Sequence, residues 1–242
     1  MSQVSENPDH GWLDDETSPE AVAEEKRLAD ELRRIIHRLV LVRPDAADLR
    51  RAADGAKEFA DALDRLRPRG GTGEVSEAGL RPNDPIRHSP LSGTSNPLAP
   101  PMMTVQIREG EDGPEGRRTE GTVRFGAAYE GPPGHVHGGL IAAMFDELLG
   151  RSQLVPGFTG SLTVWYRRPT PLDRELQVRA WVDRVDGRKR WVRGTCHLDG
   201  VLVSEAEGLF LAPREGANLQ GILASLARNA ASADQAGTGS QA

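Results

Sequence analysis

Hydrophobic and polar residues recur along the chain with two different periods, and the change between them divides the sequence into regions. Between residues 19 and 67, apolar residues recur at steps of three and four, as in α-helices with one buried face. Pro44 interrupts this pattern and Pro68 ends it, which predicts a helical hairpin with one apolar stripe on each helix. Such a pair buries little alone, so we expect the stripes to dock on the rest of the protein or on a partner chain.

Residues 101–213 instead contain short runs rich in Val, Leu, Trp and Tyr, which favour β-strands. Two strands precede a helical run at residues 139–150 and four follow it, and we expect those four to be antiparallel neighbours because short turns leave no room for helical crossovers. The simplest arrangement is an α+β fold in which the sheet wraps around the helix and leaves an edge or face for a second subunit. The expected strands are 101–109, 117–127, 161–168, 175–185, 189–198 and 201–212.

The remaining segments are poor in apolar periodicity. Residues 1–18 are expected to be disordered, and residues 68–100, with many Gly, Pro and Ser residues, form a linker or a surface arm. Residues 214–242 contain a short helical pattern followed by a Gly/Ser/Ala-rich tail that we also expect to be disordered.

Composition narrows the class of protein. The 242-residue chain has a formal net charge of −6, which argues against a general nucleic-acid-binding surface. Its single cysteine, Cys196, excludes an intrachain disulfide and a Cys-based zinc cluster, and lies in a strand-like run where an inert buried thiol is expected. The acidic N-terminal sequence has no signal-peptide pattern and no segment is apolar enough to span a membrane, so we expect a cytoplasmic protein.

The segment GPPGHVHGGLIAAMFDELLG, residues 131–150, carries the candidate chemistry. Its prolines and first glycines end a strand, and Gly138 and Gly139 stand where a helix begins. Helix starts have free backbone N–H groups and a partial positive charge, and glycine lets another group approach them closely. These features predict a site for an oxyanion or a carbonyl oxygen.

Asp146 lies along a strip of small residues on the same helix. An apolar face is expected to pack inwards, whereas the small residues leave room for a ligand or a second helix beside the carboxylate. The apolar face comprises Leu140, Ile141, Met144, Phe145, Leu148 and Leu149, and the strip comprises Gly139, Ala142, Ala143 and Gly150.

The pattern H-G-G-x-x-x-x-x-x-D, from His137 to Asp146, resembles the signature of hot-dog-fold acyl-CoA thioesterases of the PaaI-like branch. The similarity continues through GFTGSLTVWYRRPTPL, with Thr159 near its start and Arg168 near its end. It covers roughly residues 100–213 and leaves out the N-terminal hairpin. In that fold an antiparallel sheet wraps a central helix and two subunits pair their sheets.

The resemblance implies a mechanism without metal or cofactor for hydrolysis of a fatty or aromatic acyl-CoA. The thioester carbonyl would point at the helix start, where the Gly139 N–H stabilises the oxyanion. Asp146, acting across the interface of a homodimer or homotetramer, would deprotonate a water molecule or attack the carbonyl itself. Thr159 would position the water or the carboxylate, and His137 would orient the loop and the carbonyl, with a role as base as the alternative.

Gly138, His135 and Arg168 are the remaining candidate substrate-binding residues. His135 and His137 have a spacing found in metal sites, but no third ligand matches them. Arginines and a lysine near one hairpin form a solvated turn, or some of them, or Arg168, meet the phosphates of coenzyme A. The members of that basic cluster are Arg184, Arg188, Lys189, Arg190 and Arg193.

Other function classes fit less well. No G-x-S-x-G sequence exists, which argues against an α/β-hydrolase thioesterase, and no Asp–His dyad matches a hot-dog dehydratase. The alternative that stays open is a non-hydrolytic module that binds acyl-CoA or a related acyl ligand, with the N-terminal helical hairpin as regulator.

Overall fold

The computed structural model describes residues 18–66, 87–100, 104–109, 113–155 and 157–213. The chain divides into two compact units, Met1–Val40 with Asp84–Arg214, and Leu41–Asn83 with Glu215–Ala242. The first unit holds the sheet and the predicted site, and we call it the catalytic unit. The disorder predicted for both ends, the short helix near the C-terminus and most of the predicted linker lie outside the described residues.

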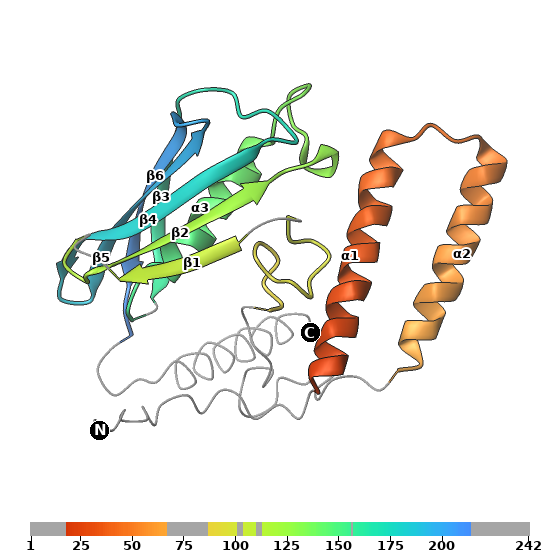
Figure 1. The fold of residues 1–242 in the computed structure, drawn as a ribbon, viewed down its shortest axis with the longest axis horizontal. Coiled ribbons are helices and arrows are strands. Elements are labelled where there is room, and N and C mark those ends of the chain that lie inside the picture. Colours follow the sequence, from red (N-terminus) through yellow and green to blue (C-terminus); the bar gives the residue numbers. More distant parts are fainter. Residues whose placement is uncertain (1–17, 67–86, 101–103, 110–112, 156, 214–242) are drawn as a thin grey trace, which may run out of the picture. The chain divides into compact units, whose positions relative to one another are not determined.

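A six-stranded antiparallel sheet forms the catalytic unit and curves around one helix (Figure 1). Its strands lie in the order β1-β2-β4-β5-β6-β3. The alternating burial along β4 shows why these runs form strands, since every second residue faces the helix. The strands are β1 (Thr104–Glu109), β2 (Arg117–Arg124), β3 (Phe158–Tyr166), β4 (Glu175–Asp186), β5 (Lys189–Leu198) and β6 (Val201–Leu211).

The prediction that the last four strands are sequential neighbours is wrong for β3. Strands β4, β5 and β6 form the expected meander, but β3 pairs with β6 at the edge of the sheet and β2 pairs with β4. Residues 167–174 therefore carry the chain across the end of the sheet from β3 to β4. Hydrogen bonds hold this crossing in place, because the N–H groups of Arg167 and Arg168 both donate to the Val203 carbonyl, at 2.9 and 3.0 Å.

The central helix α3 spans Gly138–Arg151 and contacts β2 through β6. Most of the apolar face predicted for it is buried, and Leu140 is half-buried against the same core. A fully buried Leu or Phe side chain contributes about 1.5–3 kcal/mol, so this face fixes the rotation of α3 about its axis. The buried residues are Ile141, Met144, Phe145, Leu148 and Leu149.

The two predicted N-terminal helices are present as α1 (Pro19–Leu41) and α2 (Ala46–Asp64). Helix α2 lies in the second unit, and the Asp45 side chain caps its start by accepting from the N–H groups of Ala47 and Asp48, both at 2.8 Å. On α1 the apolar stripe expected to dock stays largely exposed, with Ile35 at 55 % and Leu39 at 63 % exposure.

Helix α1, which belongs to the catalytic unit up to Val40, instead contacts the rest of that unit through a different face, whose members recur every four residues. Ala29 and Arg33 are buried, and the His37 ring meets the ring of Tyr129 edge-on, with their centroids 5.7 Å apart. Residues 87–100, part of the predicted linker, form the loop that receives Arg33. Among the described helices, none combines the length and the apolar character that crossing a bilayer requires.

Candidate active site

The start of α3 is fixed by its own N-cap residue, His137. The Nδ1 atom of this imidazole accepts a hydrogen bond from the Gly139 N–H at 3.0 Å, and its backbone N–H donates to the Tyr129 carbonyl at 2.9 Å. The Gly139 N–H, predicted as the oxyanion donor, is therefore already engaged. The Gly138 N–H has no acceptor among the described residues, so this donor at the helix start is open.

A cavity of about 450 Å³ lies beside this helix start. It brings together three residues that the sequence suggested for substrate binding, namely His135, Gly138 and Arg168. Most of its remaining surface is apolar. The other lining residues are Pro132, Val136, Ile141, Tyr166, Arg167, Pro169 and Thr170.

Two segments far apart in the sequence form the walls of this cavity. Residues 131–136 bridge to the crossing segment 167–174, because the Val136 N–H donates to the Thr170 carbonyl at 2.8 Å and the Leu172 N–H donates to the Gly134 carbonyl at 3.1 Å. His135 stabilises the first segment, with its Nδ1 atom 2.8 Å from the Pro133 carbonyl oxygen. This imidazole therefore shapes the wall through a local contact.

Asp146 lies further along α3, and its carboxylate is held by Thr159. The Thr159 hydroxyl donates to Asp146 Oδ1 at 2.8 Å. Thr159 is the second residue of β3, which forms one edge of the sheet. Thr159 is exposed and Asp146 is half-buried. The structure thus joins these two predicted catalytic residues within one chain.

The carboxylate of Asp146 and the cavity at Gly138 are far apart in one chain. Eight residues separate them along α3, which at a rise of 1.5 Å per residue amounts to about 12 Å. The carbonyl of Gly138 is engaged within the same chain, since the Tyr166 hydroxyl donates to it at 2.8 Å. A single copy of the chain therefore does not bring the carboxylate and the helix start to one substrate atom.

Most members of the predicted basic cluster have structural partners. Arg190 forms an ion pair with Glu115, at 2.7 Å between two largely buried side chains, and the Arg188 Nε donates to the Ala212 carbonyl at 2.8 Å. The guanidinium of Arg184 lies 3.6 Å above the Trp191 ring centroid. By contrast, the guanidinium of Arg168 has no polar partner among the described residues and stands at the cavity.

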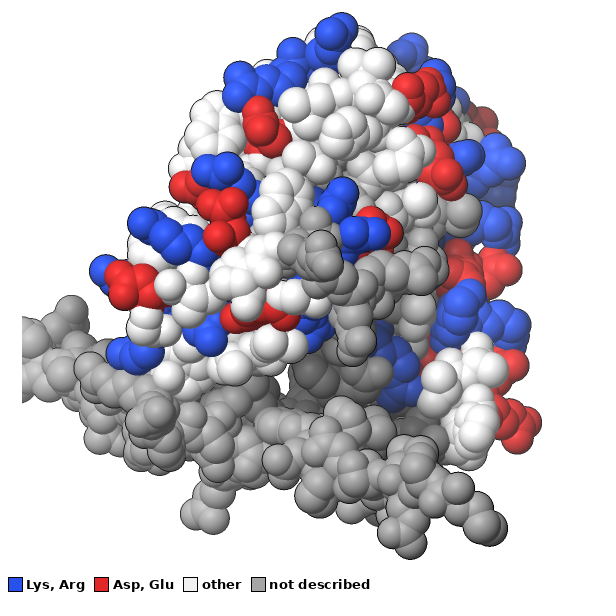
Figure 2. Space-filling view, turned by 60° about the vertical axis from the view of Figure 1, so that its left-hand side comes forward, with Lys and Arg blue, Asp and Glu red and all other residues white. Residues whose placement is uncertain are grey.

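Charge over the molecular surface is mixed in sign. On the face shown in Figure 2, Lys and Arg side chains alternate with Asp and Glu side chains and leave uncharged areas between them. On the outer face of the sheet, Arg193 contacts two carboxylates, those of Asp183 at 3.5 Å and Glu207 at 3.2 Å. No broad positive field therefore covers this face.

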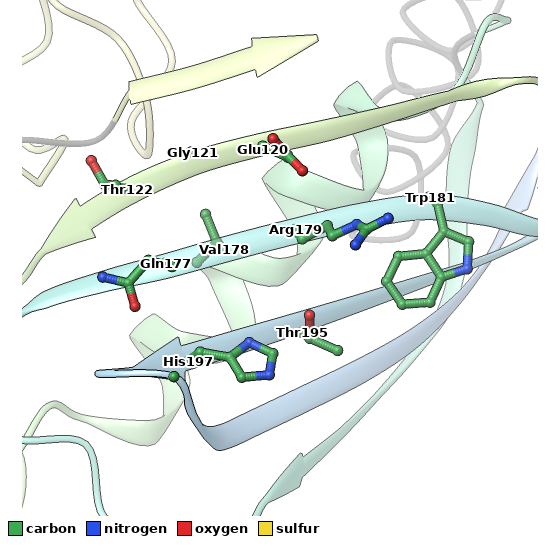
Figure 3. Close-up of a pocket in the computed structure, with 10 residues that line it drawn as sticks. Glu120, Gly121, Thr122, Gln177, Val178, Arg179, Trp181, Thr195 and His197 are labelled. Atoms are coloured by element: carbon green, nitrogen blue, oxygen red, sulfur yellow. The ribbon is translucent and has the colours of Figure 1, made fainter. Parts of the chain in front are cut away.

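A larger hollow of about 970 Å³ lies on the outer face of β2, β4 and β5 (Figure 3). Side chains in two cross-strand rows form it, since Arg179 stands between Glu120 and Thr195, and Gln177 stands next to His197. It contains none of the residues predicted for catalysis or substrate binding. His197 is thus a surface residue of this hollow, with α3 on the opposite side of the sheet.

Cys196 faces the core, as the sequence predicted. Burial raises the pKa of its thiol from 9.0 to about 12, which keeps the nucleophilic thiolate form scarce at neutral pH. In the described part of the chain, no three His, Cys, Asp or Glu side chains gather in an arrangement that could hold a metal ion.

Two features of the site escaped sequence reasoning. The first is the crossing segment 167–174, because short turns suggested sequential pairing of the strands. The second is Tyr166, whose hydroxyl reaches the first residue of α3. Its position at the end of an exposed strand, just before Arg167 and Arg168, is the sequence signal that could have indicated it.

Comparison with known proteins gives consistent matches to one family. The family described as "Thioesterase superfamily" matches residues 133–192, a segment that contains His137, Asp146 and Thr159. The acyl-coenzyme A thioesterase THEM4 of Xenopus laevis is 40 % identical over 93 residues, covering 36 % of this chain and 41 % of that protein. The acyl-coenzyme A thioesterase THEM5 of Homo sapiens is 30 % identical over 91 residues, covering 36 % and 37 %. The chain thus spans about two fifths of the length of these relatives.

One solved structure is similar over most of the chain. The crystal structure of protein RHA08564, a thioesterase superfamily protein, has a TM-score of 0.65 and 33 % sequence identity. The similarity covers 77 % of this chain and 90 % of that one, which is more of this chain than the sheet and α3 comprise. It shows that the sheet wrapped around α3 is a hot-dog fold.

Proposed function

Because the chain belongs to the thioesterase superfamily, we propose that it hydrolyses the thioester of an acyl-CoA to the free acid and coenzyme A. The observation that carries this proposal is the cavity at the start of α3, where the free Gly138 N–H, an apolar wall and Arg168 meet. The names of THEM4 and THEM5 support acyl-CoA as the substrate class. From the sequence alone we also propose that the acyl group of the substrate is fatty or aromatic and that the protein is cytoplasmic.

The helix start would stabilise the charge that develops on the thioester oxygen. The Gly138 N–H is the proposed first donor, and the Gly139 N–H joins it when the oxyanion displaces the His137 Nδ1 atom as acceptor. Each such donor is worth about 10²–10³ in rate in enzymes that stabilise an oxyanion with backbone groups. His135 would maintain the wall of the cavity, and Arg168 would meet the phosphates of coenzyme A.

Asp146 would come from a second copy of the chain, since about 12 Å separates it from the helix start of its own copy. Strand β3 supports this arrangement, because it is an edge strand with exposed side chains and its outer backbone groups are open to another strand. We therefore propose a homodimer, or a tetramer built from such dimers, with two equivalent shared sites.

In the reaction, Asp146 would remove a proton from a water molecule that forms the new C–O bond as the C–S bond breaks. Thr159 would hold the carboxylate in the orientation that its hydrogen bond fixes. Alternatively, Asp146 would attack the carbonyl directly and form a mixed anhydride that water then opens. When water opens this anhydride at the Asp146 carboxyl carbon, an unlabelled Asp146 oxygen passes to the acid. A single turnover in heavy-oxygen water separates this route from direct attack of water on the thioester, which places a labelled oxygen in the acid.

The test is release of free thiol from a panel of acyl-CoAs by the wild type and by Asp146→Asn. We expect kcat of the variant to fall by about 10² or more, the usual contribution of a positioned acid or base. Asp186→Asn, the same change on an exposed strand end, is the matched control and should keep wild-type activity. Equal activity of wild type and Asp146→Asn would remove Asp146 from the mechanism. Saturable binding without thiol release by the wild type would identify a non-hydrolytic binding module instead.

A further inference from the structure

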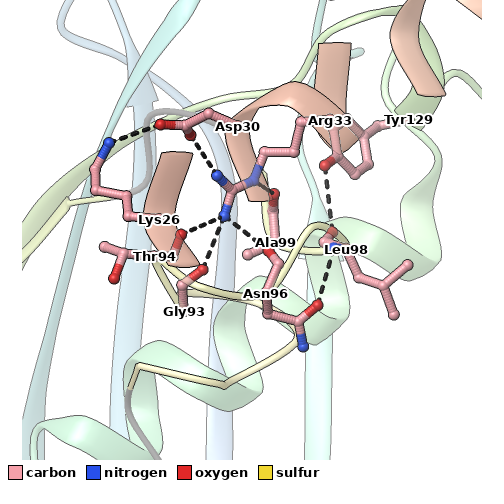
Figure 4. Close-up of polar contacts among 9 residues, drawn as sticks. All are labelled: Lys26, Asp30, Arg33, Gly93, Thr94, Asn96, Leu98, Ala99 and Tyr129. Atoms are coloured by element: carbon pink, nitrogen blue, oxygen red, sulfur yellow. Dashed lines mark hydrogen bonds and ion pairs between the residues drawn. The ribbon is translucent and has the colours of Figure 1, made fainter. Parts of the chain in front are cut away.

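The buried guanidinium of Arg33 joins α1 to loop 87–100 of the same unit (Figure 4). An ion pair between Glu25 of α1 and Arg87 of the loop, at 3.5 Å, is a second contact between these two segments. Only 6 % of Arg33 is exposed, and its Nη1 donates to Asp30 Oδ1 at 2.6 Å. Its other donors enter loop 87–100. They meet the carbonyl oxygens of Gly93 at 3.0 Å, Thr94 at 3.0 Å, Asn96 at 2.7 Å and Ala99 at 3.1 Å.

Loop 87–100 is folded so that these carbonyl oxygens converge on one point. The Gly93 N–H donates to the Ser89 carbonyl at 2.9 Å, and a Cβ atom on Gly93 would lie 2.5 Å from two backbone oxygens. Converging carbonyl dipoles repel one another unless donors stand between them, and buried acceptors without donors are costly. The planar guanidinium of Arg33 supplies several donors at once, so the loop conformation depends on it.

The loop held by Arg33 reaches the start of α3 through Tyr129. The Tyr129 hydroxyl donates to the Leu98 carbonyl at 3.2 Å, and the Tyr129 carbonyl accepts the His137 N–H at 2.9 Å. His37 packs on the same tyrosine from α1, and it lies so close to Gly126 that a Cβ atom there would be 2.4 Å from its ring. One residue thus separates the loop from the N-cap of the catalytic helix.

The same loop also reaches α3 beside Asp146. The Ser92 hydroxyl donates to the carboxylate of Glu147, the residue that follows Asp146. Arg151 completes this contact, since its Nη2 donates to the Ser92 hydroxyl at 2.5 Å and its Nε donates to Glu147 Oε1 at 3.0 Å. Loop 87–100 therefore contacts α3 directly at the residue after Asp146 and reaches the start of α3 through Tyr129.

We propose that Arg33 is a positioning residue of the active site, which acts through loop 87–100 on the N-cap His137 and on the Asp146 segment of α3. This inference rests on the proposed function for its kinetic consequence. Misplacement of a reacting group by about 1 Å is enough to cost on the order of 10² in rate, so a support several contacts away from the substrate can control kcat. Helix α1 would accordingly support the active site as well as the fold.

The kinetic test compares Arg33→Met with Arg34→Met in the full-length chain. Both changes remove one arginine from neighbouring positions of α1, but Arg34 is exposed and pairs only with Glu31, at 2.7 Å, among the described residues. We expect Arg33→Met to lower kcat about tenfold or more with KM within about threefold, because the support acts on geometry and not on substrate binding. Arg34→Met should match the wild type, and Arg33→Lys should fall between, since an ammonium cannot copy the fork of donors.

A second readout does not depend on turnover. Hydrogen exchange of the hydrogen-bonded backbone amides in residues 137–141 should accelerate about tenfold or more in Arg33→Met and stay unchanged in Arg34→Met, since only the first variant loses the support of the N-cap. If the wild type releases no thiol from any acyl-CoA, the proposed function fails while this exchange experiment still decides the role of Arg33.

Should Arg33→Met not fold, Tyr129→Phe and Ser92→Ala each remove one of the two routes while leaving Arg33 in place. Each variant should then lower kcat, and Tyr129→Phe should also accelerate exchange at residues 137–141. A folded Arg33→Met with wild-type kcat and unchanged exchange at these amides would overturn the proposal. Wild-type kcat in both Tyr129→Phe and Ser92→Ala would do the same.

Discussion

The hollow on the outer face of the sheet and the cavity at the start of α3 are formed by different kinds of groups. The larger one, on the outer face of the sheet, is lined by side chains of three strands, with carboxylate, guanidinium and imidazole groups in neighbouring rows. The smaller one is lined by two backbone segments and the start of α3. Only the smaller one includes the start of a helix, with a backbone N–H donor whose direction the helix fixes. We therefore propose the chemistry there, although the outer hollow has the larger volume.

The physical reason is preorganisation. An N–H group at a helix start already points at the place where charge develops and need not reorganise during the reaction. Side chains such as Arg179 and Glu120 have several rotatable bonds, so no helix backbone fixes the direction of their polar groups. The following predictions separate the two hollows experimentally.

The largest effect is expected for Gly138→Ala. The new Cβ atom would lie 3.5 Å from the Tyr166 ring, an ordinary contact, so the variant should fold normally. The methyl group would nevertheless stand at the wall of the cavity, and we expect thioester hydrolysis to fall on the order of 100-fold because the carbonyl is displaced. Gly55→Ala on α2, where nothing lies within 4 Å of the added Cβ, is the control and should be fully active. Unchanged kinetics in Gly138→Ala would place the reacting carbonyl elsewhere.

A smaller effect is expected for His137→Ala. The loss of the N-cap acceptor should lower the free energy of unfolding by about 1 kcal/mol, measured by denaturant titration, and lower kcat through the disordered helix start. His137→Asn keeps an acceptor at the N-cap and should recover most of the stability and activity. If His137→Asn were as inactive as Asp146→Asn, His137 would instead be the base.

The smallest effect is expected for His197→Gln in the larger hollow. This change removes an imidazole on the outer face of the sheet, away from α3, and should alter kcat and KM by less than about twofold, as for most surface substitutions. The pH dependence of hydrolysis should also stay unchanged. A large loss of activity in this variant would shift the reaction to the outer face and reverse the comparison.

Much of the fold could be predicted from local patterns. The glycine pair before an apolar face identified the start of α3, and alternation along β4 to β6 identified the meander. The position of β3 could not be predicted, because long-range pairing with β6 depends on how the crossing segment packs over residues 131–136. The docking of α1 was also missed, since an apolar stripe suggested contact where a buried arginine provides it.

The site shows the same division between local and long-range information. Asp146 and Thr159 were placed together because the resemblance to the thioesterase family implied it, and β3 follows α3 along the chain. Their hydrogen bond of 2.8 Å is consistent with that expectation. The cavity itself was not predictable, since its walls come from two segments that meet only through backbone hydrogen bonds. The engagement of the Gly139 N–H by His137 likewise depends on a side-chain rotamer that the sequence does not specify.

The central claim is that each active site combines the helix start of one copy with Asp146 of another. Co-expression of Gly138→Ala and Asp146→Asn chains tests it most directly, because a mixed dimer then holds one site with both defects and one site with none. We predict that thiol release recovers to about a quarter of the wild-type rate per chain, since half of randomly formed dimers are mixed and half of their sites are intact. Activity no higher than the average of the two separate variants, in a preparation shown to contain mixed dimers, would contradict the shared site.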